Sequence, residues 1–275
     1  MRGNKGEGEV ITVIIIIGLT IALAILFYII ASRNFGSAMA NSVMSSGETL
    51  FLNIATDLDG SLSNTISESS LSYAIPPTNL AVINIVNNYC LLYINGTLYS
   101  ESAAVIFGAS PSLVSAPAGF RVALLGNNSI ISFNRTSSIF NVNMYGYGTI
   151  NGVTYGEYIV LYPKISIFNA NSTYHIPVNS TYHIPVNSTT YYIYVPTFKA
   201  GIHYGFHGLL NFNVTGYRYS SLYVKEMTIE YRCGAGTQSI DGEIELNSTV
   251  MLINNKVIEL NSTVMLINNT VIVNE

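Results

Sequence analysis

One stretch of the 275-residue chain constrains its fold more than any other: residues Val10–Ala31 read VITVIIIIGLTIALAILFYIIA and carry no charged side chain. A helix of these 22 residues is about 33 Å long, which matches a bilayer hydrocarbon core of about 30 Å. A soluble core helix is rarely apolar on every side over such a length. The sequence therefore predicts a membrane-spanning helix near the N-terminus, with membrane lipid as its partner.

The basic residues that flank this helix predict its orientation. Arg2 and Lys5 precede it, whereas the next basic residue after Arg33 is Arg121. Because loops rich in Lys and Arg stay in the cytoplasm, we expect a single-pass protein of the cell membrane with a cytoplasmic N-terminus and an extracellular C-terminal part. A cleaved signal peptide is the alternative, since Ala38-Met39-Ala40 resembles a cleavage site. Signal h-regions usually span about 7–15 residues, however, and Arg33 separates the helix from the site.

The residues just before the helix carry a resemblance. Lys5–Ile11 reads KGEGEVI and leads into the Ile-rich helix; this resembles the N-terminus, with a class III signal peptide, of archaeal type IV pilin-like surface proteins. The resemblance covers about the first 70 residues. It implies that residues 1–6 are a leader, and that a prepilin peptidase recognises Lys5-Gly6 and cuts between Gly6 and Glu7. It also implies that the mature helices bundle into a filament core, with β-domains outside.

Two acidic residues depart from that pattern. Glu7 and Glu9 would lie at the start of the mature helix, where a filament core is apolar and an unpaired buried carboxylate is costly. Each could meet the new α-amino group of a neighbouring subunit or interact with the dipole of its own helix. In the alternative, the leader stays on and the helix, residues 7–33, is a plain anchor.

A second helical pattern follows over residues 34–75. It forms one apolar stripe with spacings of three and four: Leu50, Phe51, Ile54, Leu58, Leu62 and Ile66. Asp57 and Asp59 lie mostly off this stripe, so we expect solvated side chains. Pro76-Pro77 should end the helix by about Ala74. The pattern predicts an amphipathic stalk, with Gly36 or Gly47 as points where it could bend.

The residues from 76 to 243 have the composition and periodicity of strands. Tyr is abundant (20 residues), Trp is absent, and only 9% of residues are charged. Asn95-Gly96 and Asn151-Gly152 each separate two β-prone runs, which is a hairpin signal. Many short strands with turns between them suggest an antiparallel, sandwich-like domain. The predicted class is thus α+β, with a long N-terminal helix before an extracellular β-domain.

Two internal repeats occur in this part. Residues 171–178 recur unchanged as 179–186, and Pro177 and Pro185 argue against a central strand there. Residues 244–257 recur as 258–271 with one difference. We expect the C-terminal segment 244–275 to form short strands, Val250–Ile253 and Val264–Ile267, separated by Asn-Asn and Asn-Ser turns, at a sheet edge. The edge could belong to the same domain or to a neighbouring copy.

The residues that could carry chemistry are few. Cys90 and Cys233 lack CxxC spacing; outside the cell they could form a disulfide, and otherwise they would be buried thiols. His203 and His207 lack an evident third metal ligand. No nucleophile, phosphate-binding or dinucleotide motif is present, so the sequence predicts neither an enzyme nor a cofactor. A net charge of −4 argues against nucleic acid as a partner.

N-glycosylation is the modification that the sequence suggests, because every sequon lies on the predicted outer side. The candidate residues are Asn95, Asn127, Asn134, Asn171, Asn179, Asn187, Asn213, Asn247, Asn261 and Asn268.

Two functions fit these features. The first is a pilin-like structural or adhesive subunit of the cell surface, which assembles through its hydrophobic helix with copies of itself or with other pilin-like subunits. The alternative is a monomeric, membrane-anchored surface glycoprotein or binding module. A surface enzyme ranks third, because no catalytic constellation is recognisable.

Overall fold

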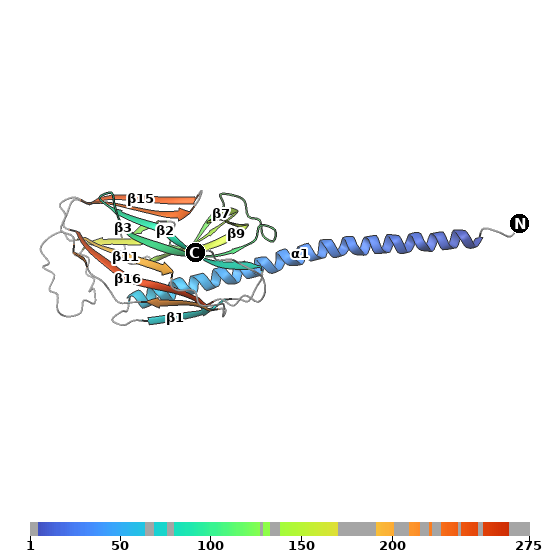
Figure 1. Ribbon diagram of the computed structural model, residues 1–275, viewed down its shortest axis with the longest axis horizontal. Coiled ribbons are helices and arrows are strands. Elements are labelled where there is room, and N and C mark those ends of the chain that lie inside the picture. Colours follow the sequence, from blue (N-terminus) through green and yellow to red (C-terminus); the bar gives the residue numbers. More distant parts are fainter. Residues whose placement is uncertain are drawn as a thin grey trace.

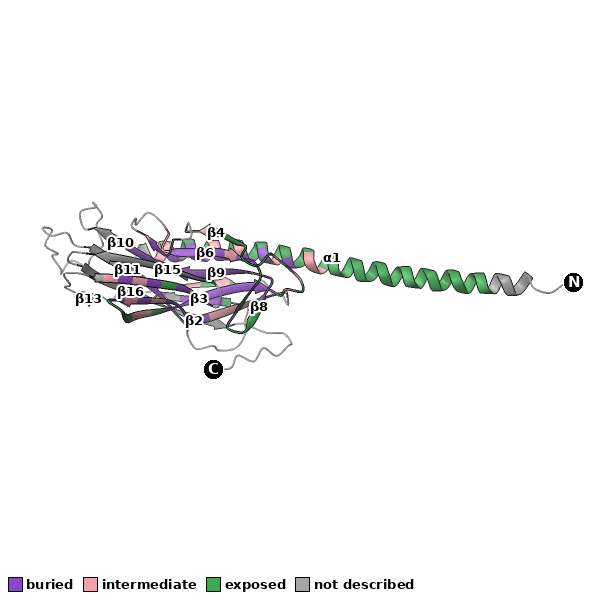
Figure 2. Cartoon of the chain, turned by 90° about the horizontal axis from the view of Figure 1, so that it is seen from above, coloured by how far each residue is buried: buried purple, intermediate pink, exposed green. Residues whose placement is uncertain are grey.

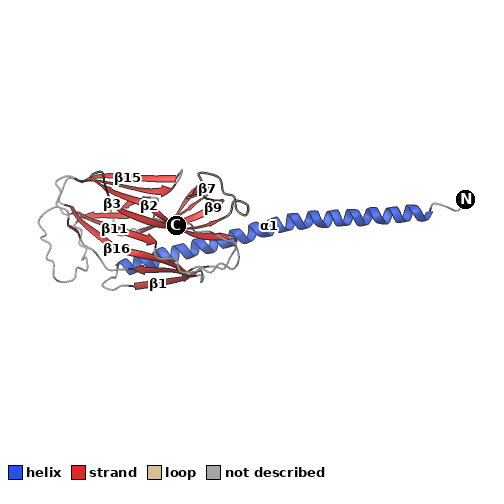
Figure 3. Cartoon of the chain, in the orientation of Figure 1, coloured by secondary structure: helices blue, strands red, loops and turns tan. Residues whose placement is uncertain are grey.

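A computed structural model gives the arrangement of the chain (Figure 1, Figure 3). It consists of one long N-terminal helix followed by a mostly antiparallel β-region, which confirms the predicted α+β class. The residues that the structure describes are 5–63, 69–75, 80–126, 129–132, 138–169, 191–200, 209–214, 220–221, 227–235, 238–246 and 250–263.

Helix α1 spans Lys5–Ser63 and has 59 residues, so it is about 90 Å long. It continues without interruption through Gly36 and Gly47, where the sequence allowed a bend. Its first half projects away from the β-region, and its second half lies against the sheets (Figure 1).

The end of this helix differs from the prediction. The stalk expected over residues 34–75 ends at Ser63, and Ser69–Ala74 forms strand β1 instead. The reason is an alternation that the helical pattern concealed: Leu71 and Tyr73 are partly buried, whereas Ser70 and Ser72 are exposed. A period of two suits a strand with one covered face.

Within the described residues, the strands form two seven-stranded sheets and one small hairpin. The first sheet has the order β1 (Ser69–Ala74), β12 (Leu209–Val214), β16 (Val250–Thr263), β11 (Tyr191–Ala200), β10 (Ile165–Asn169) and β5 (Ile131–Ser132), with β13 (Ser220–Ser221) also paired to β16. The second has the order β15 (Gln238–Leu246), β14 (Met227–Ala235), β2 (Ala81–Ile94), β3 (Thr97–Ala109), β9 (Glu157–Pro163), β6 (Phe140–Tyr145) and β4 (Arg121–Leu125). The hairpin pairs β7 (Gly148–Ile150) with β8 (Val153–Tyr155).

Both predicted Asn-Gly turns are confirmed. Asn95-Gly96 joins β2 to β3, and Asn151-Gly152 joins β7 to β8. All four residues have positive φ: 48° and 76° in the first turn, 49° and 80° in the second. Two successive residues with positive φ are typical of the type I′ turn, which matches the twist of the strands that it connects.

The C-terminal repeat departs from its prediction. β16 runs through Asn254-Asn255, where a turn was expected, and it lies inside the first sheet between β12 and β11. Between Val195 and Thr197 the partner register skips one residue on β16, so a bulge absorbs the extra length there. Residues 264–275, which include the expected strand Val264–Ile267, lie outside the described residues.

The second half of α1 is buried along one apolar stripe, which packs between the two sheets. Phe51, Ile54 and Leu58 are fully buried, as the apolar stripe predicted. The stripe also extends back through Gly47 and Met44 to Ala40. These side chains pack on Val105, Phe107 and Phe140 of the second sheet and on Phe198, Leu210 and Phe212 of the first. Figure 2 shows the change from an exposed to a buried helix.

Gly47 of α1 lies close to Phe107 of β3, and this contact generates a prediction. A Cβ at this position would lie 2.2 Å from Cε1 of the buried Phe107 ring. We expect Gly47→Ala to lower the free energy of unfolding by about 1–3 kcal/mol, because the ring or the helix must shift. Thermal unfolding of the full chain in detergent, followed by the near-ultraviolet circular dichroism of the tyrosines, measures this.

Gly60→Ala is the matched control on the same helix, because a Cβ there meets nothing within 4 Å. It should be neutral or stabilise the protein by up to about 1 kcal/mol, as alanine favours helix. An equal change in unfolding free energy in the two variants would contradict close packing of Gly47 against Phe107.

Candidate functional site: the exposed apolar helix and its attachment

The first half of α1 presents an exposed apolar surface. Every residue from Ile11 to Phe35 is exposed, and large side chains such as Leu23 and Tyr28 are 44% and 74% exposed. Figure 2 shows this segment as one continuous exposed rod. By length and composition it can cross a membrane. Burying each large apolar side chain gains about 1.5–3 kcal/mol, so this surface requires an apolar surrounding.

The helix meets the β-region abruptly. Gly36 is partly buried, and a Cβ on it would lie 3.8 Å from Cδ2 of Leu113. Ala40 is fully buried. The β-region therefore begins three to seven residues after Arg33.

Two carboxylates attach the end of the buried half to different sheets. Asp57 accepts a hydrogen bond from the hydroxyl of Tyr73 on β1, at 2.7 Å. Asp59 accepts one from the backbone N–H of Ile139, at 2.9 Å, and another from the hydroxyl of Ser138. These contacts hold one helical turn to the first sheet and to the segment that leads into β6 of the second. The prediction that both are solvated side chains is wrong for Asp59, which is only partly exposed.

The charge environment of Asp59 is unusual. Burial raises the pKa of Asp59 from 3.8 to about 6, against the opposing effects of Ser138, Ile139 and Lys164. Lys164 is fully buried, and its Nζ has no hydrogen-bond partner within the described part of the chain. Burial lowers the pKa of Lys164, and the nearby Asp59 partly offsets this.

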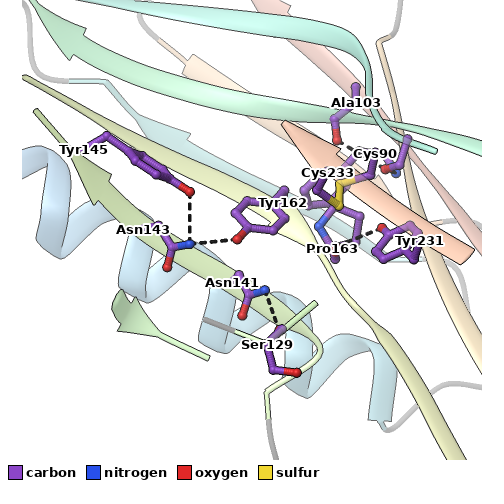
Figure 4. The surroundings of a disulfide bond; sticks show 12 residues. Cys90, Ala103, Ser129, Asn141, Asn143, Tyr145, Tyr162, Pro163, Tyr231 and Cys233 are labelled. Atoms are coloured by element: carbon purple, nitrogen blue, oxygen red, sulfur yellow. Dashed lines mark hydrogen bonds between the residues drawn. A yellow bond between two sulfur atoms is a disulfide. The ribbon is translucent and has the colours of Figure 1, made fainter. Parts of the chain in front are cut away.

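Cys90 and Cys233 form a disulfide (Figure 4). They face one another across β2 and β14, and both side chains are buried. The bond joins positions 143 residues apart in the sequence. It lies in a second core, on the face of β3 and β9 that is turned away from α1, together with Tyr89, Tyr162 and Tyr231.

A buried polar network lies beside the disulfide (Figure 4). The side-chain amide of Asn143 is 2.7 Å from the hydroxyl of Tyr162 and 3.2 Å from that of Tyr145. The guanidinium of Arg121 is 3.2 Å from the same amide atom. Because a guanidinium can only donate, this atom is the amide oxygen, which accepts from all three groups. Burial raises the pKa of Tyr162, so its hydroxyl keeps its proton and donates to Asn143, beside the charged guanidinium of Arg121.

Protein-family models, curated proteins and solved structures gave no match to this chain. Its function is therefore inferred from its own geometry.

The structure places the predicted processing and glycosylation residues as follows. Lys5, Gly6 and Glu7 belong to the first turns of α1. Asn95 is exposed in its turn, where its side-chain oxygen accepts a hydrogen bond from the backbone N–H of Thr228, at 2.8 Å. Asn213 and Asn261 lie on β12 and β16. Outside the described residues lie Asn127, Asn134, Asn171, Asn179, Asn187, Asn247, Asn268, His203, His207 and the repeat at 171–186.

The sequence analysis missed the start of the buried stripe and the partners of Asp57 and Asp59. Ala40, Met44 and Gly47 continue the stripe at spacings of four and three, but small residues carry a weak hydrophobic signal. The partners of Asp57 and Asp59 lie in strands far along the chain, and local patterns do not reveal them. Among the described residues, no group of three His, Cys, Asp or Glu is placed to hold a metal ion.

The disulfide yields a second prediction. We expect the double variant Cys90→Ala, Cys233→Ala to lose about 2–5 kcal/mol of unfolding free energy, because a loop of 143 residues is no longer closed in the unfolded chain. Urea unfolding of the full chain in detergent measures this. Wild-type protein treated with a reductant is the control and should unfold at the same urea concentration as the variant. An unchanged midpoint in both would contradict the prediction.

The buried carboxylate yields a third prediction. Below pH 3.8 Asp59 is protonated in both the folded and the unfolded chain, and up to about pH 6 the folded chain keeps the proton that the unfolded chain loses. The stability contributed by Asp59 therefore declines as pH rises through about 6, by about 3 kcal/mol in all.

Asp59→Asn removes this titration. We expect the stability of this variant relative to wild type to increase by about 2–3 kcal/mol between pH 4 and pH 7, measured by thermal unfolding. Asp57→Asn controls for the change in net charge on the same helical turn. The same pH profile in both variants would count against a special environment at Asp59.

Proposed function

We propose that this protein is a pilin-like structural or adhesive subunit of the cell surface, which assembles or is competent to assemble through its N-terminal hydrophobic helix. One observation carries the proposal: a single unbroken helix is exposed over Ile11–Phe35, has no charged side chain up to Ala31, and is then buried along one stripe in the β-region. Residues 1–6 are a leader in this proposal, removed by a prepilin peptidase.

The exposed half of α1 suits two surroundings. Lipid tails can cover it while the subunit is held in the membrane, and the same halves of other copies can cover it in a filament core. Both are apolar, and no charge in Val10–Ala31 has to be neutralised in either. Because α1 continues into the β-region, that region then lies outside the membrane or the filament core.

The β-region has features of a displayed domain. Its disulfide suits an oxidising compartment outside the cell, and Asn95 presents a sequon in an exposed turn. In this proposal the two sheets form a sandwich-like head around the second half of α1. The head is glycosylated, and its outer surface contacts other surfaces or cells.

The alternative is a monomeric, membrane-anchored surface glycoprotein or binding module. The same exposed helix favours it, because lipid alone can cover that helix and no second copy is required. The two proposals differ in what happens at Gly6 and Glu7.

Processing provides the fourth prediction. In protein purified from its native membrane we expect the chain to begin at Glu7, as shown by intact mass and N-terminal peptide mapping. Gly6→Val should leave the leader in place, because a branched side chain replaces the glycine before the cut. Gly8→Val, two residues further on, is the matched control and should be processed normally. Wild-type chains that begin at Met1 or Arg2 would favour the monomeric anchor.

A further inference from the structure

A second exposed apolar surface lies where α1 leaves the β-region. We call it the exit rim, and it consists of five large side chains that are between 38% and 68% exposed: Phe35, Met39, Phe120, Val122 and Tyr147. Phe35 and Met39 are on α1, Val122 is on β4, and Phe120 and Tyr147 are in the segments before β4 and β7. Large apolar side chains gathered at one end of a domain mark a contact surface.

Hydrogen bonds hold these segments together beside the helix. The N–H of Gly146 donates to the carbonyl of Phe120, at 2.9 Å, and the N–H of Tyr147 donates to that of Ala116, at 3.2 Å. Leu113, in the same loop, lies against Gly36 of α1. In Figure 1, β7 is found at the end of the β-region from which α1 emerges. The exit rim is therefore one structural unit around the emerging helix.

The length of the helix decides how far this rim can lie from a bilayer. The apolar run ends at Ala31, and the β-region begins at Gly36. Five residues of helix advance about 7–8 Å. The headgroup layer on each side of the hydrocarbon core is about 5–8 Å thick. When Val10–Ala31 spans the core, no stalk separates the β-region from the lipid, and the exit rim lies at the depth of the headgroups.

The chemistry of the rim suits this depth. Tyr side chains concentrate at membrane interfaces, where the apolar ring and the polar hydroxyl suit both sides, and Tyr147 is such a side chain. Two exposed arginines are close in sequence to residues of the rim: Arg33 precedes Phe35 by two residues, and Arg121 lies between Phe120 and Val122. The guanidinium of Arg121 lies 5.6 Å from the centre of the Tyr145 ring. Guanidinium groups at this level can bind lipid phosphates.

We propose that the exit rim is a lipid-binding surface that seats the β-region in the headgroup layer and sets the tilt of the displayed domain. This rests on the membrane-anchoring part of the proposed function, and it is independent of filament assembly. The occupant is the bilayer surface, because the rim is continuous with the membrane-spanning segment along α1.

The absence of Trp from the chain makes a direct test available. Phe120→Trp places one fluorescent reporter on the rim, and Tyr147→Trp is a second reporter should the first variant fail to fold. Leu98→Trp is the matched control: Leu98 is 42% exposed, but it lies at the opposite end of β3, about 35 Å along the strand from Ala109. Phe27→Trp, at a position 68% exposed on α1, reports insertion of the helix.

The full-length variants are reconstituted at low protein-to-lipid ratio into phosphatidylcholine vesicles, with and without bromine near the top of the acyl chains. We expect the Phe120→Trp emission to shift to the blue and to lose most of its intensity in brominated lipid. The Leu98→Trp emission should keep the wavelength and intensity that it has in unbrominated lipid.

The other outcomes overturn the proposal in distinguishable ways. If Phe27→Trp is quenched while Phe120→Trp behaves like Leu98→Trp, the helix is anchored and the rim does not bind lipid. If Phe27→Trp is also unquenched, membrane anchoring itself fails. If the Phe120→Trp emission is insensitive to bromine but shifts as the protein-to-lipid ratio rises, the rim binds a second copy of the chain instead.

Discussion

The structure depends on one unbroken helix that must satisfy two different surroundings. Over Ile11–Ala31 the helix is apolar on every side, and from Ala40 onward it is apolar along a single stripe. Because α-helical hydrogen bonding continues across the boundary, the two halves form one rod. Whatever covers the first half therefore fixes the position of the β-region, since the second half is built into that region.

The β-region is organised around the second half of this rod. Along β3, Val105 and Phe107 face α1, whereas Ala104 and Ile106 face the tyrosine-rich core that holds the disulfide. A central strand buried on both faces cannot release the helix without exposing its own apolar side chains to water. The hydrogen bonds accepted by Asp57 and Asp59 fix the position of the helix in this packing, because they join one helical turn to β1 and to the segment before β6.

Local patterns predicted the apolar run, the buried stripe and both Asn-Gly turns, because each depends on residues close in sequence. They failed where pairing is distant. Ile244–Leu246 and Ile258–Leu260 have the same sequence, yet the first lies at the end of β15 in one sheet and the second within β16 in the other. The sequence of the repeat is therefore not what decides its strand partners. The helix end at Ser63 was missed for a related reason, since β1 needs β12 as its neighbour.

The two proposed functions differ physically in the charge at the start of α1. Arg2 and Lys5 both lie in residues 1–6, and in both proposals their positive charge favours the cytoplasmic face for as long as these residues remain. A cut after Gly6 removes both and leaves Glu7, Glu9 and a new α-amino group. Opposite charges then meet within one turn, or between neighbouring chains, and the electrostatic hold on the inner face is lost. Cleavage would thus convert a retained anchor into a helix that can leave the bilayer for a filament core.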